Sequence, residues 1–96
     1  MKKVIRLQSY RQSLRELAAL VAKDNPRAAA QLRINIDDQV TQLEDPNFPR
    51  KIGRVKGTFE LVAQPNYIVI LEESAKTVTA LIVVHARQQW PNVLDK

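Results

Sequence analysis

Apolar residues in the first half of the chain recur every three or four positions, which is the spacing of one face of an α-helix. The first run consists of Tyr10, Leu14, Leu17, Ala18 and Val21. The second run consists of Ala29, Leu32, Ile36, Val40 and Leu43. The spacing predicts two helices, each with one face packed on a core.

Capping and turn residues indicate where these helices begin and end. Residues 3–7, with Val4 and Ile5 apolar, are typical of a short edge strand, and Ser9 is placed to cap the helix that follows. Asn25 is a good cap for the second helix, and Pro26 suits its first position. Pro46 is expected to stop that helix. The short connection predicts an antiparallel helical hairpin.

The second half of the chain has the composition of β-strands. Residues 58–63, 67–73 and 77–85 are rich in Val, Ile, Thr and Tyr and are separated by short turns, which predicts a three-stranded antiparallel meander. Residues 80–84 are almost continuously apolar, so we expect the last strand to be central and covered on both faces. The helices would cover one face, and the C-terminal tail or a partner part of the other.

The expected order of elements is therefore βααβββ, an α+β fold. Residues 47–56, with Pro49, Gly53 and four cations, are expected to form a loop before the meander. A chain of 96 residues has room for one small core, so we expect a single domain over residues 1–96.

Composition narrows the chemistry that the chain supports. Its 15 Lys and Arg against 10 Asp and Glu give a net charge of +5, which favours an acidic partner such as nucleic acid, a membrane surface or an acidic protein segment. With no cysteine and one histidine, we expect neither disulfides nor a metal site. No bilayer-spanning run, signal peptide or cofactor motif is found, so we expect a cytoplasmic protein without a membrane partner or a cofactor.

Four cations crowd into seven residues around Gly53. These cations could bind the phosphate backbone of a nucleic acid, and a solvated basic loop without a ligand explains them almost as well. They are Arg50, Lys51, Arg54 and Lys56.

Three further residues near the C-terminus are candidates for chemistry or binding. Arg87 fits a contact with phosphate or carboxylate as well as it fits an exposed charge at a strand end. His85 could act as a general base. A structural role as a hydrogen-bonded residue at the strand end fits better, because no Ser, Cys or Asp has a spacing that suggests a catalytic triad. Trp90 could stack on a base or anchor an interface. A role in packing the C-terminal tail on the sheet fits better.

Several blocks of the sequence resemble the RelE/ParE family of bacterial toxins. They are DNPRAA at 24–29, GT-x-ELV at 57–62, PNYIVI at 65–70 and HARQQWP at 85–91. The resemblance extends over the whole chain. It implies a growth inhibitor from a type II toxin–antitoxin, or plasmid stabilisation, module, in which an antitoxin's C-terminal segment wraps and neutralises the toxin.

The antitoxin implied by this resemblance is expected to bring acidic and apolar side chains to the cationic helical hairpin and to the sheet. The candidate contacts on the hairpin are Arg11, Arg15, Arg27 and Arg33.

Two mechanisms divide the family that the chain resembles. RelE-like toxins cut messenger RNA on the ribosome with basic side chains of the sheet, whereas ParE-like toxins bind DNA gyrase. Where RelE-like toxins carry these basic groups, this chain has Glu60, Val62 and Ile68, and Arg87 is the one that matches. The resemblance therefore favours gyrase inhibition. The alternative is an mRNA endoribonuclease in which Arg87 and His85 are catalytic.

Two departures from close ParE-like relatives lie in the predicted strands. Phe59 stands where an arginine is usual, and Leu71-Glu72 stands where Tyr-Arg is usual. Both changes remove polar or cationic groups from the sheet. They suggest a further alternative, an attenuated toxin or a module that only binds its antitoxin.

Overall fold

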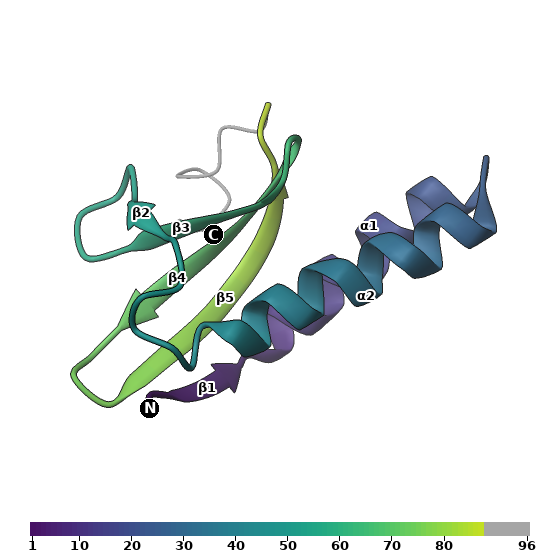
Figure 1. The fold of residues 1–96 in the computed structure, drawn as a ribbon. Coiled ribbons are helices and arrows are strands. Elements are labelled where there is room, and N and C mark those ends of the chain that lie inside the picture. The colour runs from purple at the N-terminus through teal and green to yellow at the C-terminus, as the bar shows by residue number, and fades with distance from the viewer. Residues whose placement is uncertain (88–96) are drawn as a thin grey trace.

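Two helices cover one face of a five-stranded sheet in the computed structural model, which describes residues 1–87 (Figure 1). β1 (Lys3–Arg6) leads into α1 (Gln8–Ala22), and α2 (Pro26–Gln42) returns beside it in the opposite direction. The remaining strands are β2 (Lys51–Ile52), β3 (Phe59–Gln64), β4 (Tyr67–Glu73) and β5 (Thr77–His85). The predicted α+β class, helical hairpin and meander are confirmed.

The sheet has the order β1-β5-β4-β3-β2. β1 pairs parallel to β5, from Lys3 opposite Thr77 to Arg6 opposite Ala80, while the other neighbours are antiparallel. Parallel pairing needs a long crossover connection, and the chain between β1 and β5 provides it. β5 is thus an interior strand, although β4 occupies the middle of the sheet, and β1 is the expected edge strand.

The predicted loop at residues 47–56 is wrong in one respect, because it contains the two-residue strand β2. Lys51 pairs with Glu60 and Ile52 with Phe59. A tight connection makes this pairing possible: the Gly53 N–H donates to the Thr58 carbonyl at 2.8 Å, and a Cβ at Gly53 would collide with the Thr58 hydroxyl. A strand of two residues leaves no alternation in the sequence, so periodicity does not reveal it.

The predicted cap of the first helix is also wrong. Leu7, not Ser9, is the cap residue, with extended backbone and no side-chain hydrogen bond. The Ser9 hydroxyl donates instead to the Leu81 carbonyl, and the Ser13 hydroxyl accepts from the Val83 N–H at 2.9 Å. The two serines therefore satisfy the edge of β5 beyond the point where β1 ends.

The predicted start of the second helix is confirmed. The Asn25 side chain accepts from the Ala28 N–H at 3.0 Å, and Pro26 occupies the first turn. The helix ends at Gln42, before the expected stop at Pro46, because Leu43, Glu44 and Asp45 donate their N–H groups to carbonyls three residues back in tighter turns.

The main core lies between the helices and the sheet and contains most of the predicted apolar stripes. Tyr10 and Leu14 from α1 and Ile36 and Val40 from α2 are buried there against β3, β4 and β5. A second, smaller cluster on the opposite face of the sheet consists of Ile68, Ile70 and Val84, with Val55 packed against it. β4 is therefore buried on both faces, whereas β5 is partly buried on the face away from the helices, at Leu81 and Ile82. The expected cover by the tail lies outside the described residues. Neither helix within residues 1–87 is long and apolar enough to cross a membrane.

Candidate functional site

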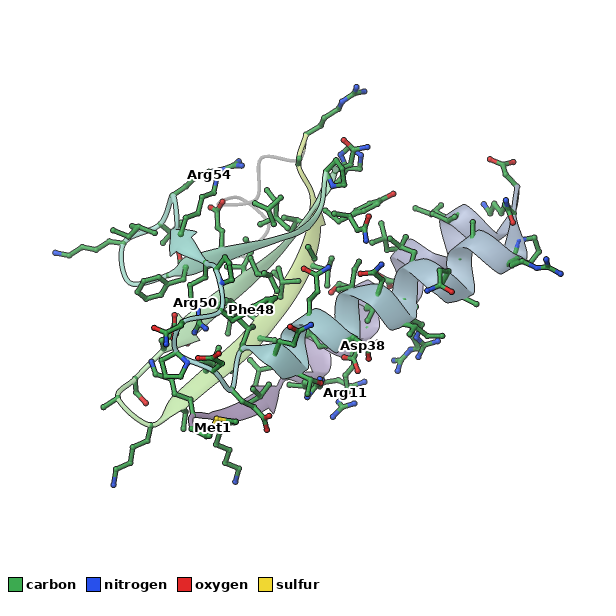
Figure 2. All side chains as sticks on the ribbon, viewed as in Figure 1. Met1, Arg11, Asp38, Phe48, Arg50 and Arg54 are labelled. Atoms are coloured by element: carbon green, nitrogen blue, oxygen red, sulfur yellow. The ribbon has the colours of Figure 1, made fainter. Side chains whose placement is uncertain are left out.

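The helical hairpin carries a cationic groove on its outer side. α1 and α2 enclose a hollow of about 250 Å³, and three arginines line it, Arg11, Arg15 and Arg33. Figure 2 shows Arg11 on the side of the hairpin that faces away from the sheet. Within residues 1–87 these guanidinium groups form no hydrogen bond or ion pair, so their charges are available to a partner. Ile34, which is largely exposed, adds apolar surface to the groove.

Asp37 lines the same groove but is bound from inside the protein. Its carboxylate accepts from the Tyr10 hydroxyl at 2.8 Å and from the Arg6 Nε at 2.9 Å. Burial opposes ionisation of Asp37, but the hydrogen bonds from Tyr10 and Arg6 and the charges of Arg6 and Arg11 outweigh it and lower its pKa. Burial, followed by the bond to Asp37, raises the pKa of Tyr10. The groove therefore keeps a fixed anion beneath its outer arginines.

The four hairpin candidates are not equivalent. Arg11, Arg15 and Arg33 meet in the groove, whereas Arg27 lies at an exposed position in the first turn of α2 and does not line it. The structure thus divides the predicted set into a group of three and one separate residue.

The basic loop, residues 50–56, is bound by a buried carboxylate that was not predicted from the sequence. Glu60 is only 1% exposed, and its carboxylate accepts from the backbone N–H of Arg54 at 3.1 Å. The side chains of Arg54 and Lys51 lie 3.6 and 4.0 Å from the same carboxylate. Lys56 is exposed in the same loop. Because Glu60 offsets part of the cationic charge, the loop is a weaker site for phosphate than its sequence indicates.

Arg50 belongs to the fold rather than to an open basic surface. Its side chain is 8% exposed and forms an ion pair with Glu73 at 2.8 Å. It also donates to the carbonyls of Phe48 and Asp45, at 2.9 and 2.6 Å. Figure 2 shows Arg50 beside Phe48, whereas Arg54 points away from the helices. A guanidinium held by three internal acceptors has few donors left for a ligand.

His85 and Arg87 lie together at the end of β5. The Arg87 N–H donates to the His85 Nδ1 at 3.1 Å, and the His85 ring packs edge-on against Tyr67 with ring centres 5.4 Å apart. In this contact the Nδ1 atom of His85 is the acceptor. The predicted reading of His85 as a hydrogen-bonded residue at a strand end agrees with this geometry.

The basic loop and the His85–Arg87 pair lie at opposite ends of the central strands. The basic loop leads into Phe59, which pairs with Leu71, whereas Tyr67 at the other end of β4 pairs with His85. The backbone therefore does not bring the loop and the His85–Arg87 pair to the same end of the sheet.

Some features of these surfaces were missed in the sequence. Ile34 is 55% exposed, and its position off the apolar stripe of α2 was the available signal. No local signal pointed to the inward bonds of Asp37 or to the burial of Glu60. Trp90 lies outside the described residues. Within residues 1–87, no three His, Cys, Asp or Glu side chains are grouped as metal ligands would be.

The sequence is similar to a family of toxins and to one protein named as a putative toxin. The family model described as "ParE toxin of type II toxin-antitoxin system, parDE" matches residues 4–90. The protein named "Putative toxin Y4kP" from Sinorhizobium fredii (strain NBRC 101917 / NGR234) is 38% identical over 81 residues, 84% of each chain.

A solved structure from the chromosomal ParDE toxin–antitoxin system of P. aeruginosa is also similar. It matches with a TM-score of 0.78 and covers 91% of this chain and 98% of its own. At 16% sequence identity this likeness shows the fold alone.

Proposed function

The chain belongs to the ParE family of toxins from toxin–antitoxin systems, and we propose that it inhibits bacterial growth by binding DNA gyrase in the cytoplasm rather than by cutting RNA. In such a module, the toxin would stabilise a plasmid by harming cells that lose the antitoxin. Its own antitoxin would neutralise it.

The burial of two side chains of the sheet carries the choice of gyrase over RNA. Glu60 and Ile68 stand where an mRNA-cleaving toxin would need basic groups, and they are 1% and 4% exposed. A buried carboxylate and an aliphatic side chain neither reach a phosphate nor offset the negative charge that develops during RNA cleavage. Binding to a protein target does not need such a basic cluster.

The placement of the remaining cations supports the same choice. An RNA-cleaving site would have to combine Arg87 and His85 with the cations of the basic loop. These groups start from opposite ends of the strands, and Arg50 is held by Glu73. Arg54, Lys56 and Arg87 remain candidates for contacts with the target protein.

The groove between α1 and α2 is the surface that best suits the antitoxin. Arg11, Arg15 and Arg33 offer charge to carboxylates, while the exposed Ile34 offers apolar contact. We therefore assign the antitoxin's acidic and apolar segment to this groove.

Purified protein provides the decisive test of the mechanism. We expect the chain to inhibit negative supercoiling of relaxed plasmid DNA by gyrase and to leave mRNA intact in a translating extract. In cells, thymidine incorporation should fall before methionine incorporation after induction without the antitoxin. Adding the antitoxin should restore both gyrase activity and growth.

The opposite results identify the alternatives. Ribosome-dependent mRNA cleavage that is lost in Arg87→Ala, with gyrase unaffected, would replace the gyrase proposal by RNA cleavage. Normal growth of cells that accumulate the folded chain without an antitoxin would indicate an attenuated toxin or an antitoxin-binding module.

A further inference from the structure

Strand pairing on the outer edge of β3 stops after two residues. Lys51 pairs with Glu60, and continuing the same antiparallel register would place Pro49 opposite Val62. Proline has no N–H to donate, so it cannot continue the ladder at this position. Within residues 1–87, no strand pairs with this edge of β3 beyond Glu60.

The backbone groups of Val62 point toward this outer edge. The Thr58 carbonyl accepts from Gly53 on the β2 side, and alternate residues of a strand direct their N–H and C=O groups to the same side. Glu60 uses this side for β2. Val62 follows two residues later, with one donor and one acceptor facing outward.

A hollow of about 440 Å³ lies beside this edge. Leu61, which packs into the main core, and Val62, which faces the other way, both line it. Side chains from both faces of β3 therefore meet in the hollow, so it opens over the edge of the sheet. Phe48 and Pro49 provide an apolar wall.

The exposed edge is apolar and short. The side chain of Val62 is 49% exposed and that of Ile52 is 81% exposed, although natural edge strands usually carry charges or proline. Beyond Val62 the edge closes, because the Gln39 side chain donates to the Ala63 carbonyl at 2.6 Å and the register shifts before Gln64. The accessible segment is thus centred on Val62.

Charge decides between two occupants of this edge. A second copy of the chain would bring Lys51 and Arg54 close to the same cations of its partner, and each copy carries a net charge of +5. An extended acidic segment avoids this repulsion, because a carboxylate would meet the mostly exposed Lys51. An aliphatic side chain of that segment would fit against Phe48 and Pro49.

We propose that an extended segment of the antitoxin adds to the sheet at Val62, hydrogen-bonding its N–H and C=O and placing one aliphatic side chain in the neighbouring hollow. This strand-addition site rests on the proposed toxin–antitoxin function and is separate from the arginine groove. Backbone bonds supply the affinity in this binding mode, and the hollow supplies the selectivity.

Amide hydrogen exchange tests the site without altering the chain. The free protein is compared with its complex with the antitoxin encoded beside it. We expect exchange at the Val62 amide to slow by about tenfold or more in the complex, because a new hydrogen bond must open first. A complex in which this amide exchanges as in the free protein overturns the strand-addition site alone.

Other outcomes of the exchange experiment are equally clear. If the protein encoded beside this chain forms no complex with it, both the antitoxin proposal and the strand-addition site fail. Protection of Val62 that rises with the concentration of the free chain would show pairing between two copies and overturn the assignment to the antitoxin.

A pair of variants gives a second test. Val62→Pro removes the donor at an edge position where proline is tolerated, and we expect it to weaken antitoxin binding by roughly fivefold to tenfold. Val62→Ile keeps both the donor and the apolar side chain and should change binding by less than about twofold. Equal affinities for the two folded variants would contradict the site.

Discussion

At the scale of single residues, one buried carboxylate connects three distant parts of the chain. Glu73 at the end of β4 pairs with Arg50 at 2.8 Å and with Lys2 at 2.9 Å, from the segment before β2 and from the N-terminus. Both the Glu73 and Arg50 side chains are largely shielded from water. Removing one partner would leave a buried charge without compensation.

Glu73→Ala is therefore expected to lower the free energy of unfolding by about 3 kcal/mol, because it leaves the Arg50 guanidinium unpaired. Urea denaturation measures this change. Glu72→Ala, at the exposed neighbouring position, is the matched control and should stay within about 0.5 kcal/mol of the unaltered protein. Equal losses in the two variants would show that the buried pair has no special role.

The lowered pKa of Asp37 gives a second prediction at this scale. Its ordinary value is 3.8, and in the fold it lies lower, so the ionised carboxylate contributes stability that is fully present above about pH 4. That contribution is lost as the pH falls through the folded-state pKa. Asp37→Asn should therefore reduce the loss of stability on acidification, measured by urea denaturation between about pH 2 and pH 6.

Asp38→Asn is the control for this measurement, since Asp38 is the exposed neighbour of Asp37 on α2. We expect it to keep the acid dependence of the unaltered protein. An unchanged acid dependence in Asp37→Asn would mean that the bonds from Tyr10 and Arg6 do not stabilise the ionised carboxylate.

At the scale of the elements, the two helix starts show why one capping prediction was right and the other wrong. Asn25 follows a turn with no competing partner, and its side chain caps α2. Ser9 lies next to the edge of β5, and its hydroxyl donates to the Leu81 carbonyl instead. A cap is predictable when its acceptor or donor is local, whereas a bond across 72 residues depends on how the chain folds.

Asn25→Ala should lower the free energy of unfolding by about 1 kcal/mol, because the Ala28 N–H loses its acceptor at the start of α2. Thermal or urea denaturation provides the measurement. Gln31→Ala, at an exposed position of the same helix, should have an effect below about 0.5 kcal/mol. If Asn25→Ala is no more destabilising than this control, the cap is not a significant part of the stability of α2.

At the scale of the whole molecule, folding separates cations that are paired inside the protein from cations that line an open groove. Arg6 and Arg50 are paired with carboxylates, whereas Arg11, Arg15 and Arg33 line an outer groove. Only part of the cationic charge behind the net charge of +5 is therefore open to a binding partner. The groove is the surface at which we propose that this charge attracts an acidic antitoxin.

Arg33→Glu is expected to weaken antitoxin binding by about tenfold or more, because it places a negative charge among the groove arginines. Titration calorimetry at about 50 and 500 mM salt should also show that binding of the unaltered chain weakens with salt, and that the variant depends less on salt. Arg27→Glu makes the same charge change on the same helix outside the groove. Equal losses of affinity in both variants would assign the effect to overall charge.

The order of the residues was sufficient to predict the helical hairpin, the meander and the family resemblance. Helical and strand periodicities are local properties, and the stripes from Tyr10 to Val21 and from Ala29 to Leu43 are long enough to express them. For the same reason, the bounds of β4 and β5 were predicted at residues 67–73 and 77–85.

Tertiary structure decided which charged groups are used internally and which surfaces are open. The sequence shows Arg50, Lys51 and Arg54 as neighbours in one basic cluster, but folding brings Glu73 to the first and Glu60 to the other two. Pairing between β2 and β3 likewise ends at Lys51, because Pro49 cannot continue the ladder opposite Val62, and an edge of β3 stays open. Such contacts join residues far apart in the chain, so their outcome depends on long-range packing and not on any local pattern.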